Sequence, residues 1–475
     1  MMTSCGGQVV HVRLLFVLRI SSLMKNSQFR FAAQRAYRLV QFFLLLIFAG
    51  VVQGGTHTDS PNVIMILADD VGFECFSAYG SNEYSTPRLD ALAAGGIRFE
   101  NCHSTPLCTP SRVNLMTGKS NVFNYFDFGV YPKGEPTFAN YFRQHGYATA
   151  VAGKWQLQTN KGGISPEEAG FGTHCLWNIP GGGRERYWNP SLVQDGKLLK
   201  LPKGTYGPDV TTDFLIDFIK RNQSKPFLAY FPMILPHNPF PVTPDSVDPK
   251  SKDQKRNFID MVQYIDKNVG RLEDTLKELG LRENTLIIFT GDNGTNSVLT
   301  SELNGRAVQG GKGYTHDYGT HVPLVVNWPG KVPGGRVVDD LICFSDLFPT
   351  MVEAAGLPAK KITDGDGWSF WPQCLGHPGK KREWIYCYYF PRPSSAKYND
   401  KYSHYEVRFA RDKRFKLYDN GELFDTIEDV LERHPIAVDT AGPRAESARR
   451  VLQQAIDSYP AAGRNANRRA RDGGK

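Results

Sequence analysis

The strongest constraint on the fold is a set of short, continuously apolar runs that recur along the chain. Two of them occupy residues 63–68 and 286–289, and two more lie within residues 227–240 and 322–330. Runs of this length are typical of strands buried on both faces, as in a parallel sheet. The chain is therefore expected to build its core around such a sheet.

Helical patterns separate these runs. In residues 257–281, apolar side chains recur at spacings of three and four, which indicates an amphipathic helix, and Gly280 stands where a C-cap belongs. Residues 86–99 and 136–155 each read as a helix followed by a strand. This alternation predicts an α/β fold with a large, mostly parallel central sheet flanked by helices. The stripe of the long helix consists of Phe258, Met261, Val262, Ile265, Val269, Leu272, Leu276 and Leu279.

The pattern changes near residue 376. Beyond it, short alternating segments rich in Tyr, Phe and Arg predict antiparallel strands in a smaller C-terminal subdomain, closed by a helix over residues 445–459. We therefore expect three parts: an N-terminal extension and signal peptide (1–54), a large α/β domain (55–375), and a C-terminal subdomain with a basic tail (376–475). A composition of 41% hydrophobic and 22% charged residues is that of a globular protein.

The N-terminal segment has the layout of a secretory signal. From Met24 onward it carries four basic residues, then an apolar run over residues 42–52, then small residues near Gly54. Because a membrane-spanning helix needs about 20 apolar residues, no stable membrane anchor is expected. The sequence predicts an exported protein, periplasmic or secreted, with Met24 as the hypothetical true start.

The positive charge does not indicate a nucleic-acid-binding protein. The formal net charge is +8, but residues 1–54 and 441–475 carry all of the basic excess. The body between them is slightly acidic, so no nucleic-acid partner is expected. The basic C-terminal tail reads as a solvated, frayed end.

Acidic and amide side chains follow two of the apolar runs. Asp69 and Asp70 come directly after the first, and Asp292 and Asn293 follow another. Ligands of open α/β sheets bind beyond the carboxyl ends of the strands, and converging carboxylates need a cation to offset their repulsion. If the two strands are neighbours, these oxygens suit Ca²⁺ or Mg²⁺. The alternative is that each pair is only a helix cap or a turn.

Cys108, in the stretch TPLCTPSR, is the cysteine whose surroundings suggest chemistry. Pro110 and Ser111 favour a helix start just after it, and a thiol at that position next to Arg112 is expected to have a lowered pKa. The alternative is a buried structural cysteine. Seven cysteines follow the N-terminal segment, and the odd number indicates one unpaired thiol.

The motifs resemble those of the type I sulfatases, members of the alkaline-phosphatase-like superfamily. CTPSRVNLMTGK carries the C-x-P-S-R signature, and the resemblance takes in most of the chain beyond the N-terminal segment. It includes the stretches PNVIMILADDVGFECFSAYG, GKW, GDNG, GGKG, VPLVVNWPG, SDLFPTMVEAAG and GELFD, in the family's order and spacing. The resemblance implies the alkaline-phosphatase-like fold and hydrolysis of sulfate esters.

For Cys108, the resemblance implies oxidation by a formylglycine-generating maturation enzyme to Cα-formylglycine. This aldehyde hydrates to a gem-diol. One oxygen attacks the sulfate sulfur, and loss of a proton from the second hydroxyl expels sulfate and regenerates the aldehyde. A serine in its place would form a sulfate ester that hydrolyses slowly.

The resemblance also assigns roles to other residues. As metal ligands, with Ca²⁺ favoured over Mg²⁺, it implies Asp69, Asp70, Asp292, Asn293 and modified Cys108. Arg112 matches the arginine that holds the gem-diol, and Lys154 and Lys312 match two lysines that bind sulfate oxygens. His237 resembles the histidine that protonates or stabilises the leaving oxygen. Three cationic groups suit the charge of the transition state.

One position departs from the family pattern. Gln156 follows GKW where a histidine that assists release is usual, and glutamine cannot accept a proton near neutral pH. Three alternatives follow: another residue acts as the base in place of this histidine, the release of sulfate is slow, or the chain is not a competent hydrolase. His316 and His321 are candidates for a replacement base, although a surface or core position is the commoner place for a histidine.

Three functions are compatible with this sequence. The first is a sulfatase acting on a sulfate ester, with a sulfated carbohydrate favoured as the substrate. The second is a phosphoester or phosphonate hydrolase of the same superfamily, and the third is a sulfate- or glycan-binding pseudoenzyme. The aromatic loop at residues 176–190 could stack on sugar rings, with Arg184 and Arg186 meeting anionic groups, or be a plain connection. His103 reads as structural.

Overall fold

The computed structural model describes residues 60–159, 162–358, 365–390, 406–440 and 442–461. The predicted signal segment, with its apolar run at 42–52, lies outside the described residues, as does the basic tail beyond residue 461. Residues 58–475 form one unit that contains every element discussed below. The division of this unit near residue 376 stays a prediction.

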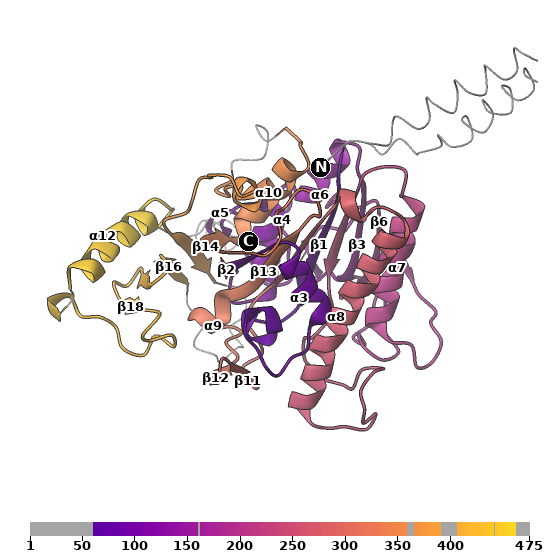
Figure 1. Cartoon of the computed structure of the whole chain (residues 1–475), viewed down its shortest axis with the longest axis horizontal. Helices are drawn as coiled ribbons and strands as arrows, with labels where there is room; N and C mark the ends of the chain where they lie inside the picture. Colours follow the sequence, from indigo (N-terminus) through magenta and orange to yellow (C-terminus); the bar gives the residue numbers. More distant parts are fainter. Residues whose placement is uncertain (1–59, 160–161, 359–364, 391–405, 441, 462–475) are drawn as a thin grey trace, which may run out of the picture. The chain divides into compact units, whose positions relative to one another are not determined.

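A ten-stranded sheet lies at the centre of the fold (Figure 1), with the strand order β14-β2-β13-β10-β1-β9-β3-β6-β7-β8. Its strands are β1 (Asn62–Ala68), β2 (Ile97–His103), β3 (Ala148–Lys154), β6 (Thr173–Trp177), β7 (Val193–Gln194), β8 (Lys197–Leu198), β9 (Phe227–Pro232), β10 (Thr285–Gly291), β13 (His321–Asn327) and β14 (Arg336–Cys343). The four apolar runs of the sequence form β1, β9, β10 and β13. All four predicted strands are therefore confirmed.

The middle of this sheet is parallel. β1 pairs in parallel with β10 on one side and with β9 on the other, and β3 pairs in parallel with β9 and β6. β13 runs antiparallel to β10 and β2, whereas β14 is parallel to β2. The prediction of a mostly parallel central sheet is confirmed, and its parallel centre brings the carboxyl ends of β1, β3, β9 and β10 to one edge.

Both faces of the sheet are covered, as the lack of alternation in β1 predicted. Val63, Met65 and Leu67 join one buried cluster, while Ile64 and Ile66 join another on the opposite face. The first cluster contains side chains of α4 (Cys108–Thr117), α6 (Phe138–Gln144) and α10 (Leu347–Ala354). The second contains side chains of α3 (Pro87–Ala94), α7 (Gly207–Arg221) and α8 (Gln254–Glu278).

The long predicted helix is α8, which Figure 1 shows running beside α7. Its apolar stripe is buried apart from Leu279, which is partly buried at the C-cap. Gly280 then adopts a φ of +67°, a left-handed conformation that glycine reaches without a steric penalty. The predicted glycine at the helix end is therefore confirmed.

The C-terminal region forms a separate four-stranded antiparallel sheet, as predicted. Its strands are β15 (Ile385–Tyr389), β16 (Val407–Arg411), β17 (Phe415–Tyr418) and β18 (Leu423–Asp425), in that order. The closing helix is α12 (Pro443–Asp457), which packs Leu452 and Ile456 against Leu417 and Leu423. The smaller elements are α5 (Asn121–Asn124), α9 (Asp317–Thr320), α11 (Trp371–Cys374), β4 (Gln158–Thr159), β5 (Gly162–Gly163), β11 (Thr300–Leu303) and β12 (Arg306–Gln309).

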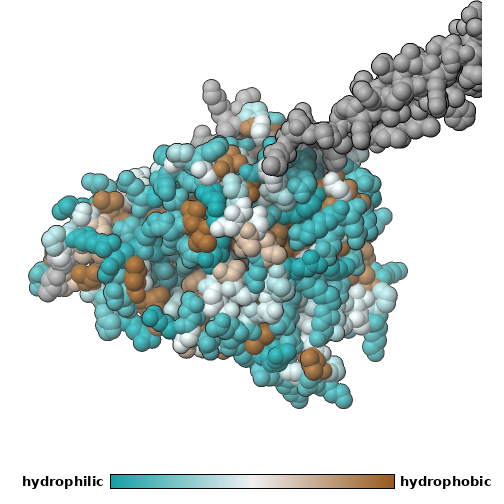
Figure 2. Space-filling model, in the orientation of Figure 1, coloured by the Kyte–Doolittle hydropathy of each residue, from teal (hydrophilic) through white to brown (hydrophobic). Residues whose placement is uncertain are grey.

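The face shown in Figure 2 is mostly hydrophilic, with apolar residues in small separate groups. Among the described residues, no helix is both long and apolar enough to span a bilayer. The seven cysteines from Cys75 onward are all unpaired, so the expectation of a single free thiol is wrong. Six of the seven are buried, which is the usual environment of a structural cysteine.

Candidate active site

The acidic pairs that follow β1 and β10 meet because these strands are neighbours. Ala68 lies opposite Gly291 in the parallel register, so the next residues of both strands leave the sheet side by side. The backbone amide of Asp70 donates to Asp292 Oδ1 at 3.0 Å, and Asn293 Nδ2 donates to Asp70 Oδ1 at 3.0 Å. The condition that the sequence left open, adjacency of the two strands, is met.

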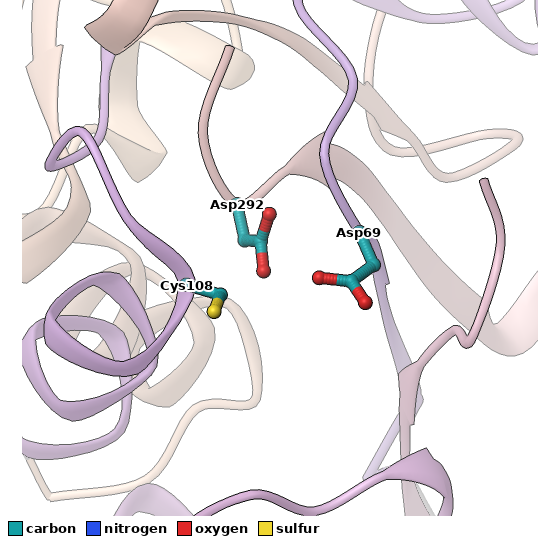
Figure 3. A group of neighbouring side chains, drawn as sticks. All are labelled: Asp69, Cys108 and Asp292. Atoms are coloured by element: carbon teal, nitrogen blue, oxygen red, sulfur yellow. The ribbon is translucent and has the colours of Figure 1, made fainter. Parts of the chain in front are cut away.

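Cys108 is the first residue of α4, and its side chain faces the carboxylates. Figure 3 shows the thiol of Cys108 and the carboxylates of Asp69 and Asp292 directed toward one another. One ligand atom from each of these three side chains lies within 4.8 Å of the others. Residues from three distant parts of the chain thus meet in one buried cluster.

The thiol of Cys108 is not the acidic thiol that the sequence suggested. Burial raises the pKa of Cys108, and the nearby carboxylates of Asp292 and Asp69 add to this effect, against the lowering influence of Lys154. The expectation of a lowered pKa is therefore wrong for the unmodified thiol. Because a protonated thiol is a poor nucleophile, this environment does not favour direct thiolate chemistry.

Arg112 lies one helical turn after Cys108 and is fully buried. Its Nη2 is 3.0 Å from Asp292 Oδ2 and 3.5 Å from Asp69 Oδ1, while its Nη1 donates to the carbonyl oxygen of Lys154 at 2.9 Å. The guanidinium thereby joins α4 to the ends of β1, β3 and β10. It is a fixed positive charge that interacts electrostatically with Cys108.

Lys154 ends β3, two strands away from β1. Its Nζ lies 2.7 Å and 2.9 Å from the two carboxylate oxygens of Asp69. Burial opposes ionisation of Asp69, yet the positive charge of Lys154, reinforced by Arg112, holds the pKa of Asp69 well below its usual range. In contrast, burial and repulsion from Asp69 raise the pKa of Asp292 to about 7.

His237 and Lys312 complete the cationic side of the site. Lys312 Nζ forms a short contact with Asp70 Oδ2 and lies 3.1 Å from His237 Nε2. His237 Nε2 is itself 3.4 Å from Asp70 Oδ2. Burial lowers the pKa of His237 to about 4, against the attraction of Asp70. The structure thus brings every sequence-predicted site residue into one continuous network.

The donor set fits a hard cation. The carboxylates of Asp69, Asp70 and Asp292 are fully buried, and Asn293 Oδ1 is buried with no hydrogen-bond partner among the described residues. An orphaned amide oxygen beside three carboxylates is what a Ca²⁺ site of oxygen ligands would use. His237 joins Asp69 and Asp70 in a second grouping of possible ligand atoms, which the sequence analysis did not anticipate as a ligand set.

Gln156, the departure from the family pattern, lies directly at the thiol. Cys108 Sγ is 3.0 Å from Gln156 Oε1. The backbone of Gln156 has a φ of +56°, and its amide donates to the carbonyl oxygen of Asn178 at 3.0 Å. The glutamine therefore occupies a position where a side chain can act on the atom bound to the β-carbon of residue 108.

Neither candidate for a replacement base belongs to this network. His321 Nε2 donates to the carbonyl oxygen of Glu100 at 2.6 Å, and its ring stacks on Phe73. His316 stacks on Tyr314. Within the described ranges, neither forms a hydrogen bond or ion pair with Cys108 or Gln156. His103 is structural, as expected: it is buried, with Nδ1 3.2 Å from Thr320 Oγ1.

The burial of His321 predicts acid sensitivity. Burial lowers its pKa to about 4, whereas an unfolded chain has the ordinary value near 6.5. As the pH falls from 6.5 to 4, His321 is protonated in the unfolded chain but stays neutral in the folded protein. Protonation therefore favours the unfolded state, and the stability that the protein has above pH 6.5 is lost. We expect a loss of about 3 kcal/mol in the free energy of unfolding from this group.

Urea titrations at pH 7 and pH 4 measure this loss. His321→Gln keeps a donor for the carbonyl oxygen of Glu100 but cannot be protonated, so its loss of stability should be smaller by about that amount. An equal acid-induced loss in the wild type and in His321→Gln would contradict the prediction.

The C-terminal sheet supports the loop that carries Lys312, which the sequence analysis missed. Lys416 in β17 is fully buried and donates from Nζ to the carbonyl oxygen of Thr315 at 2.7 Å. Tyr418 Oη donates to Thr315 Oγ1 at 2.8 Å. Arg411 in β16, also buried, pairs with Asp317. The sequence signal for this support was a lysine in the middle of an apolar strand. Because buried charges are almost always paired, such a lysine indicates a polar partner elsewhere in the chain.

Comparison with known proteins places this site in a family. The sulfatase family matches residues 61–357, and the family of the C-terminal region of N-sulphoglucosamine sulphohydrolase matches residues 311–457. The first match spans more than half of the chain and includes every site residue described above. The chain belongs to the sulfatase family.

Individual relatives agree. The chain is 30% identical over 373 residues to the N-acetylgalactosamine-6-sulfatase of Canis lupus familiaris, covering 70% of this chain and 69% of that protein. It is 31% identical over 369 residues to human arylsulfatase A, covering 69% of this chain and 70% of that protein. These relatives support assignment of this member of the family as a sulfatase.

A solved structure confirms the fold. A protein in complex with its substrate, D-glucosamine-2-N,6-O-disulfate, superposes with a TM-score of 0.69 at 21% identity, covering 84% of this chain and 98% of that one. The alkaline-phosphatase-like arrangement that the motifs predicted is therefore the arrangement of this sulfatase.

Proposed function

We propose that this sulfatase cleaves a sulfate ester of a carbohydrate through a Cα-formylglycine made from Cys108. The observation that carries the proposal is the buried cluster in which ligand atoms of Cys108, Asp69 and Asp292 lie within 4.8 Å of one another. The raised pKa of the thiol supports a modified rather than a thiolate nucleophile. A maturation enzyme would have to oxidise Cys108 before folding buries it.

A divalent cation, proposed to be Ca²⁺, would be held by Asp69, Asp70, Asp292, Asn293 and the modified residue 108. When bound, this ion and the aldehyde hydrate would together supply an attacking oxygen of lowered pKa and a hydroxyl through which sulfate can be expelled. The orphaned Asn293 Oδ1 supports an ion in this position.

The cationic side chains would bind and orient the sulfate group. Lys154 and Lys312 each lie against a carboxylate of the proposed metal site, so both reach the place where sulfate oxygens would meet the ion. Arg112, which pairs with Asp292, would help to orient the oxygens of residue 108. Preorganised positive charge of this kind stabilises the developing charge of the transition state.

His237 would serve the leaving group. It stands between Lys312 on its Nε2 side and Arg186 on its Nδ1 side, at 3.1 Å and 2.9 Å. A hydrogen bond donated from Nε2 could stabilise the departing alcohol oxygen. Because its pKa is lowered to about 4 in this structure, a neutral ring is the form expected near neutral pH.

Two measurements test the proposed function. Mass spectrometry of the Cys108 peptide, from protein produced in the native host, should show the aldehyde or its hydrate. Turnover of matched 4-nitrophenyl sulfate and 4-nitrophenyl phosphate should favour the sulfate. An unmodified thiol would favour the pseudoenzyme, and preference for phosphate would favour the phosphoester hydrolase.

Gln156 leads to a prediction about release. Glutamine at 3.0 Å from the sulfur can accept a hydrogen bond but cannot take a proton, so removal of the second hydroxyl proton should be slow. We expect Gln156→His to raise steady-state turnover by about tenfold or more while leaving the first burst of product unchanged. Histidine tolerates the positive φ of this position better than most residues.

Rapid-quench kinetics with 4-nitrophenyl sulfate separate the burst from the steady state. Gln156→Asn, which also lacks a base, is the matched control and should not accelerate turnover. A larger burst with an unchanged steady-state rate in Gln156→His would contradict slow release as the native limitation.

A further inference from the structure

Next to His237 lies an arginine, Arg186, that has no carboxylate partner among the described residues. Its place is set by β6, whose last residue, Trp177, lies opposite Lys154 in the parallel register with β3. The amide of Trp155 continues this pairing by donating to the carbonyl oxygen of Trp177 at 2.9 Å. Trp177 is therefore fixed beside the sulfate-binding lysine of the proposed site.

Arg186 lies on the indole ring of Trp177. Its Cζ is 4.0 Å from the ring centroid, and its Nη1 is 2.9 Å from His237 Nδ1. The following residue, Tyr187, is buried and donates from its hydroxyl to the carbonyl oxygens of Ile234 (at 3.1 Å) and His237. The half-buried guanidinium is thus held against His237, on the Nδ1 side of its ring.

The charge of Arg186 is not neutralised by an ion pair. Arg112, Lys154 and Lys312 all pair with carboxylates of the site, whereas Arg186 forms no ion pair with any described residue. Within the same residues, its Nε and Nη2 also make no hydrogen bond. A planar cation that keeps donors available while packed on an aromatic ring is suited to bidentate binding of a carboxylate or a sulfate.

We propose that Arg186 binds a second anionic group of the substrate, a sulfate or a carboxylate on the sugar that carries the cleaved ester or on its neighbour. This subsite rests on the proposed function, because the position of the sugar follows from His237 facing the leaving oxygen. The substrate is accordingly a polyanionic carbohydrate rather than a singly sulfated one.

Binding of paired ligands tests the subsite. Isothermal titration calorimetry of the full chain in Ca²⁺ buffer, in a Cys108→Ala background that prevents turnover, would use two pairs. The first compares N-acetyl-D-glucosamine-6-O-sulfate with D-glucosamine-2-N,6-O-disulfate. The second compares N-acetyl-D-galactosamine-6-O-sulfate with the chondroitin 6-sulfate disaccharide, which adds a carboxylate. In at least one pair, the member with two anionic groups should bind about tenfold more tightly.

Arg186→Gln should reduce the ratio of the two affinities within that pair to nearly one, and Arg186→Lys should keep part of the preference. Arg184→Gln removes an equal charge from an exposed position of the same loop and should keep the ratio. Circular dichroism and thermal melting would show that the variants are folded. No preference in either pair, or a preference that survives Arg186→Gln, would overturn the proposal.

The outcome is independent of catalysis. If the intact protein hydrolyses 4-nitrophenyl sulfate but neither pair shows a preference, only the subsite is wrong. If the preference is present and lost in Arg186→Gln, but no sulfate ester is hydrolysed, the subsite stands and the proposed hydrolysis is wrong. If Arg186 acted only by positioning His237, Arg186→Gln would lower kcat equally for all sulfate esters and leave the ratio unchanged.

Discussion

Cys108→Ala is expected to lower the turnover of 4-nitrophenyl sulfate by about 10⁴-fold or more, because it removes the only proposed nucleophile. The stability of the fold should change little. Cys108 contributes one small buried side chain at the start of α4, and within the described residues its side chain lies 3.0 Å from Gln156 Oε1. Initial rates and thermal melting, measured on the same preparation, distinguish loss of chemistry from loss of folding.

Cys108→Ser sharpens this expectation. Its hydroxyl can attack sulfur once, but the product lacks a second hydroxyl through which sulfate could leave. We expect at most one equivalent of 4-nitrophenol, with an increase of about 80 Da in the mass of the protein, because an SO₃H group replaces the hydroxyl hydrogen. Such an adduct would place the nucleophile on residue 108 directly.

The matched control is Cys343→Ser, which changes a partly exposed cysteine that has no contact with the site network in the described part of the chain. It should retain full turnover. Steady turnover by Cys108→Ala, or equal losses in Cys108→Ala and Cys343→Ser, would contradict the assignment of Cys108.

The fold could be predicted from the sequence largely because its central strands carry a local signal. An apolar run without alternation has to be buried on both faces, and residues 63–68 do lie between two cores. The acidic pairs at Asp69 and Asp292 could also be recognised in the sequence, because each pair follows directly after one of these apolar runs. What the pattern alone left open was whether β1 and β10 are neighbours.

Other features of the site depend on contacts that the sequence does not encode locally. The raised pKa of Cys108 comes from burial beneath the ends of several strands, which outweighs the expected effect of a helix start. The support of the loop beyond Lys312 comes from Lys416, about a hundred residues later in the chain. His316 and His321 were plausible bases by proximity in sequence, but their rings are directed to other partners.

Arg112→Met is expected to destabilise the protein by about 3–5 kcal/mol and to abolish turnover. The arginine is buried, and its removal would leave Asp292 and Asp69 without the cation that bridges them. Removing one partner of a buried charge cluster costs more than the pair contributes, because the remaining charge stays desolvated. Urea unfolding in EDTA measures the change in stability without a contribution from bound metal.

Asp292 offers an internal check on this mechanism. Its pKa is already raised to about 7, so this carboxylate is the group most easily neutralised when Arg112 is lost. Asp292→Asn in the Arg112→Met background should therefore recover part of the stability, giving a coupling energy of at least about 1 kcal/mol in a double-mutant cycle. Activity should not return, because the asparagine cannot replace a carboxylate ligand of the proposed ion.

Arg282→Met is the matched control for a buried arginine outside the site. Arg282 lies 3.5 Å from Glu273 and donates from Nη1 to the carbonyl oxygen of Thr285 at 3.0 Å, at the start of β10. Its replacement should lower stability but leave kcat/KM of the folded protein near the wild-type value. If Arg112→Met melts like the wild type and still turns over sulfate esters, the guanidinium does not hold Asp69 and Asp292 together. If Arg112→Met and Arg282→Met lose kcat/KM equally, the effect of Arg112 is not specific to the site.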